Sequence, residues 1–150
     1  MNKIMLLVGL IFILFPSQSQ ILINEIMTDN KLCIMDSDGD YPDWIELYND
    51  SNLNVNLNNY SLSDDIENLT KWRFPDITIN NESTLLIFAS GKDVITDSEI
   101  HTNFKLSSSG EFLYLSNASG FVIDSINPIH LGEDDSYGRL PDGATYLTHL

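Results

Sequence analysis

The chain has 150 residues, of which 43% are apolar and 19% charged, and its formal net charge is −15. This length fits one domain of ordinary size, and the apolar content is too high for a disordered chain. The negative charge argues against nucleic acid and anionic membranes as partners, because both attract a surplus of Lys and Arg. A single cysteine, Cys33, excludes an internal disulfide framework and any zinc site built from cysteines.

Residues 1–19 have the pattern of a secretory signal peptide. Lys3 supplies a positive charge, an apolar stretch covers residues 4–15, and Ser17 and Ser19 precede a cleavage site before Gln20. The stretch is too short for a membrane span, which needs about 20 residues. We therefore expect a signal peptide at 1–19 and a secreted or cell-surface domain at 20–150. This domain should contain no membrane span, and it has one positive charge fewer than the full chain because Lys3 is removed. The alternative is that the stretch forms a buried strand or helix.

Beyond Gln20 the hydrophobic pattern repeats every two residues, as in β-strands. In the candidate strand Trp44–Tyr48, Ile45 and Leu47 fall on one face and Trp44 on the other. Leu85–Ala89 is continuously apolar, which predicts a strand covered on both faces. In chain order the expected strands are Ile21–Met27, Trp44–Tyr48, Tyr60–Leu62, Trp72–Phe74, Ile77–Ile79, Leu85–Ala89, and a hairpin of Glu111–Leu115 and Phe121–Ile126 around the turn Ser116–Gly120.

The strand pattern indicates an all-β fold with little helix. Asn, Asp, Ser and Gly cluster between the candidate strands, where these residues favour turns. Eight or nine short strands in a domain of this size predict an antiparallel β-sandwich, with a closed barrel as the competing arrangement. In a sandwich, Trp44 and Trp72 are more typical of the core than of a platform that stacks on sugars. Cys33 lies in an apolar patch and is expected to be buried as a small hydrophobic residue.

An acidic loop is the best candidate for a metal site. Asp36, Asp38, Asp40 and Asp43 surround Gly39, and alternating carboxylates in such a loop can converge on calcium, which prefers six to eight oxygen ligands. The spacing does not match an EF-hand. The alternative is a solvated turn whose aspartates accept hydrogen bonds from nearby backbone N–H groups.

No catalytic motif is assembled in the sequence. The three histidines, His101, His130 and His149, are far apart in the chain, and the metalloprotease, nucleophile-elbow and phosphate-loop patterns are missing. Paired carboxylates carry little information in a chain with 22 acidic residues. We therefore expect that the protein is not an enzyme and needs no cofactor other than the calcium considered above.

Eight segments, spread over nearly all of residues 20–150, follow one another in a recognisable order. They are Ile23–Met27, Asp38–Asn49, Leu57–Asp64, Trp72–Pro75, Leu86–Gly91, Asn103–Leu106, Gly110–Leu115 and Ser136–Gly143. In this order they resemble the lamin tail domain, an immunoglobulin-like β-sandwich found in nuclear lamins and in many exported bacterial proteins. Family members usually continue past the last strand into a segment with a Pro-Gly turn and a closing Asn. Since this chain stops at Leu150, the domain is expected to lack that segment.

The resemblance implies a non-catalytic, exported, immunoglobulin-like module that contacts a protein or a cell-surface polymer. Its contacts are expected at the loops of the sandwich ends or at an exposed sheet edge. One alternative is an N-terminal accessory domain of a larger secreted enzyme, of the spore-coat-kinase-like, nuclease or phosphatase kind. Another is a weak calcium-binding adhesion module. Nucleic-acid binding, claimed for nuclear lamin tails, conflicts with the acidic composition.

Overall fold

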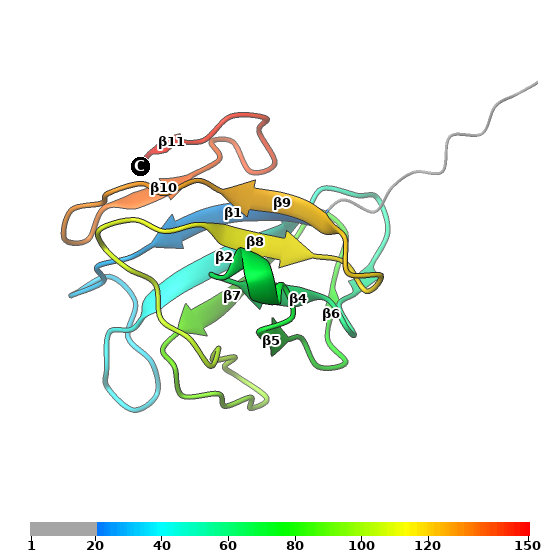
Figure 1. Ribbon diagram of the computed structural model, residues 1–150, viewed down its shortest axis with the longest axis horizontal. Helices are drawn as coiled ribbons and strands as arrows, with labels where there is room; N and C mark the ends of the chain where they lie inside the picture. The colour runs from blue at the N-terminus through cyan, green and yellow to red at the C-terminus, as the bar shows by residue number, and fades with distance from the viewer. Residues whose placement is uncertain (1–20) are drawn as a thin grey trace, which may run out of the picture.

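The computed structural model describes residues 21–150 as an all-β protein whose helical structure there is one 3₁₀ turn, η1 (Ile66–Asn68) (Figure 1). The predicted signal peptide lies outside the described residues. Within residues 21–150, no helix is long and apolar enough to cross a membrane. The strands are β1 (Ile21–Met27), β2 (Asp43–Asn49), β3 (Val55–Asn56), β4 (Ser61–Ser63), β5 (Trp72–Arg73), β6 (Thr78–Ile79), β7 (Thr84–Ala89), β8 (Leu113–Ser116), β9 (Val122–Ile126), β10 (Ser136–Gly138) and β11 (Thr148–His149).

The larger sheet is antiparallel and has five strands in the order β11-β10-β1-β2-β7. The alternation predicted for β2 is confirmed, because Ile45 and Leu47 are fully buried in the main core. Trp44 lies on the opposite face, where it packs with Met27 of β1 and Phe88 of β7. We call these three residues, Met27, Trp44 and Phe88, the outer cluster.

The smaller sheet is antiparallel and has four strands in the order β5-β4-β8-β9, and β3 and β6 form a separate two-stranded ladder. The predicted hairpin is confirmed as β8 and β9, which are joined by a turn at residues 117–121. Asn117 N donates a hydrogen bond to the Phe121 carbonyl at 2.9 Å, and Asn117 Oδ1 accepts from Ser119 N and Phe121 N. Gly120 adopts a φ of +82°, a conformation that glycine tolerates and that reverses the chain.

The two larger sheets enclose one hydrophobic core, and in Figure 1 β4, β8 and β9 lie over β1, β2 and β7. The five-stranded sheet contributes Ile23, Ile45 and Ile87, and the four-stranded sheet contributes Leu62 and Leu115, all fully buried. Burying each such side chain contributes roughly 2 kcal/mol. Because the two sheets share no strand pair in the described residues, the fold is the predicted antiparallel sandwich rather than a closed barrel.

Side chains join the two sheets where β9, an edge strand of the smaller sheet, meets β1, the central strand of the larger sheet. The carboxylate of Asp124 in β9 accepts a hydrogen bond from Ile23 N of β1 at 2.8 Å. It also forms an ion pair with Arg139 Nη2 at 3.0 Å. Arg139, only 9% exposed, donates from Nε to the Ile23 carbonyl at 3.2 Å and from Nη1 to the Ala144 carbonyl at 2.6 Å. This pair therefore ties β9, β1 and the segment after β10 together.

Three short strands were not predicted from the sequence. β3, β10 and β11 each have only two or three residues, too few to show an alternation of apolar and polar side chains. The equally short β4, β5 and β6 were predicted, because they lie within the expected strands Tyr60–Leu62, Trp72–Phe74 and Ile77–Ile79 or overlap them. The prediction that Leu85–Ala89 is covered on both faces is correct only in part, because Leu85 and Leu86 in the first half of β7 are half-buried.

The predicted burial is correct for both tryptophans and wrong for Cys33. Trp72 is 3% exposed in the main core and Trp44 is 6% exposed in the outer cluster. Cys33 is exposed because residues 30–34 form a turn around the Asn30 side chain, whose Oδ1 accepts hydrogen bonds from Cys33 N and Ile34 N. Ile34, in the same turn, packs its side chain against the outer cluster.

Candidate functional site

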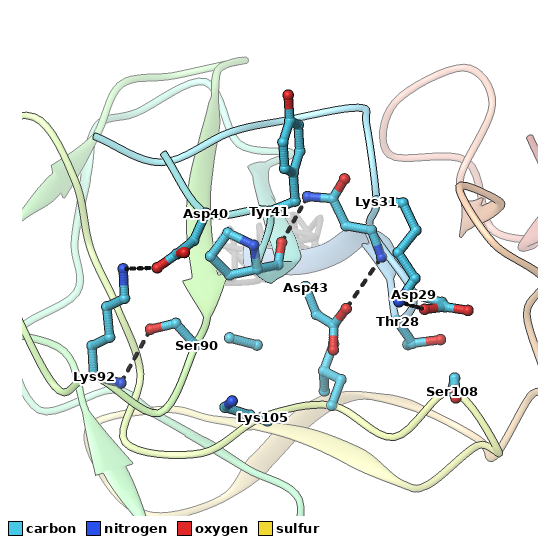
Figure 2. Close-up of a pocket in the computed structure, with 14 residues that line it drawn as sticks. Thr28, Asp29, Lys31, Asp40, Tyr41, Asp43, Ser90, Lys92, Lys105 and Ser108 are labelled. Atoms are coloured by element: carbon cyan, nitrogen blue, oxygen red, sulfur yellow. Dashed lines mark hydrogen bonds and ion pairs between the residues drawn. The ribbon is translucent and has the colours of Figure 1, made fainter. Parts of the chain in front are cut away.

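An open pocket of about 560 Å³ lies at the end of the sandwich where β1 and β7 finish and β2 begins (Figure 2). Its walls come from four segments: residues 28–31 after β1, residues 40–43 at the start of β2, residues 89–92 after β7, and residues 105–108 before β8. Pockets of this size bind small ligands or single groups of larger partners. The pocket is therefore formed by loops at a sandwich end, one of the two locations expected from the sequence.

Three adjacent strands supply the inner wall of this pocket. Each strand places one residue in the outer cluster, so the neighbouring residues Thr28, Asp43 and Ala89 face inward, toward the opposite sheet. Asp43 and Ala89 are direct partners in the β2–β7 ladder. Asp43 thus lies on the same face as the core residues Ile45 and Leu47, at the point where the core opens to solvent.

Asp43 is a half-buried carboxyl group with few partners. Its Oδ1 accepts a hydrogen bond from Asn30 N at 3.3 Å, which Figure 2 shows as a dashed line. Burial raises the pKa of Asp43 above the ordinary aspartate value, and the nearby charge of Asp29 adds to this effect. The hydrogen bond from Asn30 and the charges of Lys31 and Lys105 act in the opposite direction. Asp43 therefore retains capacity to accept hydrogen bonds from a bound group.

Three lysines and three aspartates line the pocket, and most of them form ion pairs with one another. Among the described residues, Lys105 forms no ion pair, and neither does Asp43. The paired groups are Lys31 with Asp29 (2.6 Å) and Lys92 with Asp40 (3.1 Å).

The structure brings together three of the four residues predicted to bind calcium. Carboxylate oxygens of Asp36, Asp38 and Asp40 lie within 4.8 Å of one another. Lys92 Nζ lies against all three, at 2.6, 2.7 and 3.1 Å respectively. Asp43 is not part of this group and lines the pocket instead. Calcium binding by the loop stays a prediction.

Asp36 organises the acidic loop. Its side chain is buried, and its Oδ1 accepts hydrogen bonds from Asp38 N at 3.1 Å and Asp40 N at 2.9 Å. Burial acts to raise the pKa of Asp36, but the hydrogen bonds from Lys92 and the two backbone groups lower it below the ordinary value. The hydrogen bonds to these carboxylates raise the pKa of Lys92. Lys92 therefore occupies the centre of the loop, and calcium would have to displace it.

A Ser-His-Glu series beside the pocket was missed in the sequence, where His101 lies far from the other histidines. Ser90 Oγ lies 3.0 Å from His101 Nδ1, and His101 Nε2 lies 3.4 Å from Glu99 Oε2. Hydrolases use a similar order of nucleophile, base and carboxylate. Here His101 is 3% exposed and stacks on Phe88, and Ser90 Oγ already accepts a hydrogen bond from Lys92 N at 3.1 Å. We interpret the series as a structural link between the loop after β7 and residues 99–101.

The sequence carried a signal for part of this pocket. The alternation of β2 places Asp43 on the apolar face, and a carboxylate at the end of such a face indicates an opening of the core. Thr28 and Lys105 lie in loops, whose side-chain directions depend on contacts between distant segments. The sequence therefore could not predict which side chains surround Asp43.

Comparison with protein-family models gives a match to the Lamin Tail Domain over residues 15–130. A search of the curated proteins finds no match. The matched residues cover more than half of the chain and include β1 to β9, whereas β10 and β11 lie beyond them. The two facing antiparallel sheets agree with the immunoglobulin-like sandwich expected of this family. The chain therefore belongs to the lamin tail domain family.

Proposed function

We propose that this protein is an exported, non-catalytic binding module that contacts a protein or a cell-surface polymer through the pocket at the end of its sandwich. The observation that carries the proposal is the composition of the pocket. It places an unpaired carboxylate, Asp43, and an unpaired ammonium, Lys105, in one open cavity on a rigid β-scaffold. Rigid elements that hold a few convergent polar groups are typical of binding sites.

The proposal is tested by binding of the domain 20–150 to two fractions of the source organism, its envelope proteins and its purified surface polymers. We expect the wild-type domain to bind one fraction saturably, and the double variant D43N/K105M to lose at least about tenfold in affinity. The matched control is E67Q/R73M, which removes one acid and one base from exposed positions outside the pocket. Equal binding by both double variants would refute the pocket as the binding site.

A second candidate function, weak calcium binding, is favoured by the convergence of Asp36, Asp38 and Asp40. Because Lys92 fills the space between these carboxylates, calcium and the ammonium group exclude each other. The variant K92M should therefore bind calcium more tightly than the wild type in titration calorimetry. No heat from either protein at about 10 mM calcium would eliminate the site.

A further inference from the structure

The two unpaired charges of the pocket lie within each other's electrostatic influence but form no contact. Lys105 is among the groups that lower the pKa of Asp43, yet no ion pair joins them. Of the described lysines, Lys31, Lys71 and Lys92 form ion pairs, whereas Lys105 forms none. A bound molecule that places a cation near Asp43 and an anion near Lys105 would complete both pairs.

A buried hydroxyl group next to Asp43 also lacks a partner. Thr28 is 6% exposed and lines the pocket, and its Oγ1 forms no hydrogen bond with any described residue. Met27 pairs with Trp44 at the end of the β1–β2 ladder, so Thr28 and Asp43 occupy the next position on the two chains, and both line the pocket (Figure 2). A buried hydroxyl group without a partner is destabilising, because it has lost its hydrogen bonds to water. Thr28 therefore adds a polar side chain without a hydrogen-bond partner to the wall of the pocket.

We propose that the pocket binds a short zwitterionic peptide or amino-acid unit, with its ammonium group on Asp43 and its carboxylate on Lys105. This inference rests on the proposed binding function and names the chemical class of the ligand. A cavity of about 560 Å³ accommodates a unit of a few small residues. The ion pairs that Lys31 and Lys92 form leave Asp43 and Lys105 as the groups available for charge recognition.

The test uses four forms of one tripeptide: trialanine with both ends free, N-acetylated, C-amidated, and blocked at both ends. Binding to the domain 20–150 is followed by the NMR shifts of its backbone amides near the pocket. We expect free trialanine to bind in the millimolar range or tighter, with saturable shifts at Thr28, Asn30 and Ser90. Each single block should weaken binding at least about tenfold, because each removes one charged contact.

Variants of Asp43 and Lys105 show which end of the peptide each of these side chains binds. In D43N, free and N-acetylated trialanine should bind equally, and in K105M the free and amidated forms should bind equally. T28V, which removes only the hydroxyl group, should weaken the free peptide, whereas E67Q and R73M should bind it like the wild type.

Two results would overturn the inference: equal binding by all four peptides, or no shift with free trialanine at about 20 mM. If D43N/K105M still loses binding to an envelope fraction in that case, the proposed function stands and only the ligand class is wrong. If that binding is also unaffected, both are wrong.

Discussion

Asn49 shows how a single buried amide organises a chain reversal. The side chain is fully buried, and its Nδ2 donates to the carbonyls of Leu53, Ile79 and Asn80 at 2.8, 3.1 and 3.1 Å. Its Oδ1 accepts hydrogen bonds from both the backbone N and the hydroxyl group of Ser51. One residue therefore holds the loop after β2 against the segment between β6 and β7.

Replacing this amide should cost much of the stability of the domain. We expect N49A to lower the free energy of unfolding by about 3 kcal/mol, because several buried backbone groups lose their partner at once. Urea denaturation at pH 7 measures the change. The exposed neighbour Asn52 gives the control N52A, which should remain within about 0.5 kcal/mol of the wild type. An equal, small effect of both variants would show that water replaces the amide at no cost.

Glu46 provides a pH-dependent test at the same scale. Burial raises the pKa of Glu46, which is only partly offset by hydrogen bonds from Asn24 and Thr84. The folded protein therefore holds this proton more tightly than the unfolded chain, so the ionised form destabilises the fold at pH 7. We expect E46Q to be more stable than the wild type by roughly 0.5 kcal/mol at pH 7.

This advantage of E46Q should disappear as the pH falls below the unfolded pKa of glutamate, because the wild-type carboxyl group is then protonated in both states. Urea denaturation at pH 7 and near pH 4 measures the difference. The exposed Glu67 gives the control E67Q, which should match the wild type at both pH values. An advantage of E46Q that persists at low pH would assign the effect to packing instead.

The sequence predicted these residues only as members of patterns. Asn49 was expected only as the end of the segment Asp38–Asn49, and the alternation of β2 places Glu46 on the same face as Trp44. What the pattern could not supply is the partner of each side chain. Asn24 contacts Glu46 across β1 and β2 and also donates to Asp142, 118 residues away.

At the scale of elements, the ion pair of Asp124 and Arg139 joins β9 to β1 and to the segment after β10. Both side chains are largely buried, so removal of one leaves the other without its counter-charge. We expect R139M to lower the free energy of unfolding by about 3 kcal/mol in urea denaturation, because Asp124 and two backbone carbonyls lose their donor.

The matched control is R73M, since Arg73 is exposed and makes one long hydrogen bond to the Asn59 carbonyl at 3.3 Å. It should change stability by less than about 0.5 kcal/mol. Similar losses in R139M and R73M would show that the guanidinium group is not what links the strands. Loss of NMR signals from β10 alone would show that the pair anchors this strand but not the whole sandwich.

Strand length explains why the alternation of the longest strands was visible in the sequence. β1, β2 and β7 have six or seven residues, enough for an alternation of inward and outward side chains to be visible. β10 has three residues, and its Gly138 lies so close to β1 that a Cβ there would be 2.8 Å from the Asn24 carbonyl oxygen. Such a contact between distant segments leaves no periodic trace in the sequence.

At the scale of the whole molecule, the excess of acidic residues opposes compaction. The chain carries 22 acidic and 7 basic residues. Like charges on a compact surface repel one another, and dissolved salt screens this repulsion. We expect the thermal midpoint to rise by about 3 °C between roughly 0.05 M and 0.5 M sodium chloride. Differential scanning calorimetry measures the shift, and a fall in the midpoint would show that surface ion pairs contribute more than the net repulsion.

The global fold was predictable because it depends on many repeated signals, whereas the pocket depends on a few particular contacts. The alternating strands and the eight ordered segments identified an antiparallel sandwich of the lamin tail domain family. The pocket, in contrast, requires four segments to meet, and its residue Lys105 lies 62 positions after Asp43 in the chain. Asp43 was recognised as a candidate ligand, but its position in the same cavity as Lys105 was not.

The central place of β1 in the larger sheet has a consequence for the order in which the molecule assembles during synthesis. β1 is the first described strand to leave the ribosome, yet Arg139, which bonds to its Ile23 carbonyl, follows 116 residues later. Until that segment emerges, one edge of the nascent β1 has no lasting neighbour. We therefore expect vectorial folding to finish only near the end of translation, and ribosome-stalled chains that end before residue 139 should remain sensitive to protease.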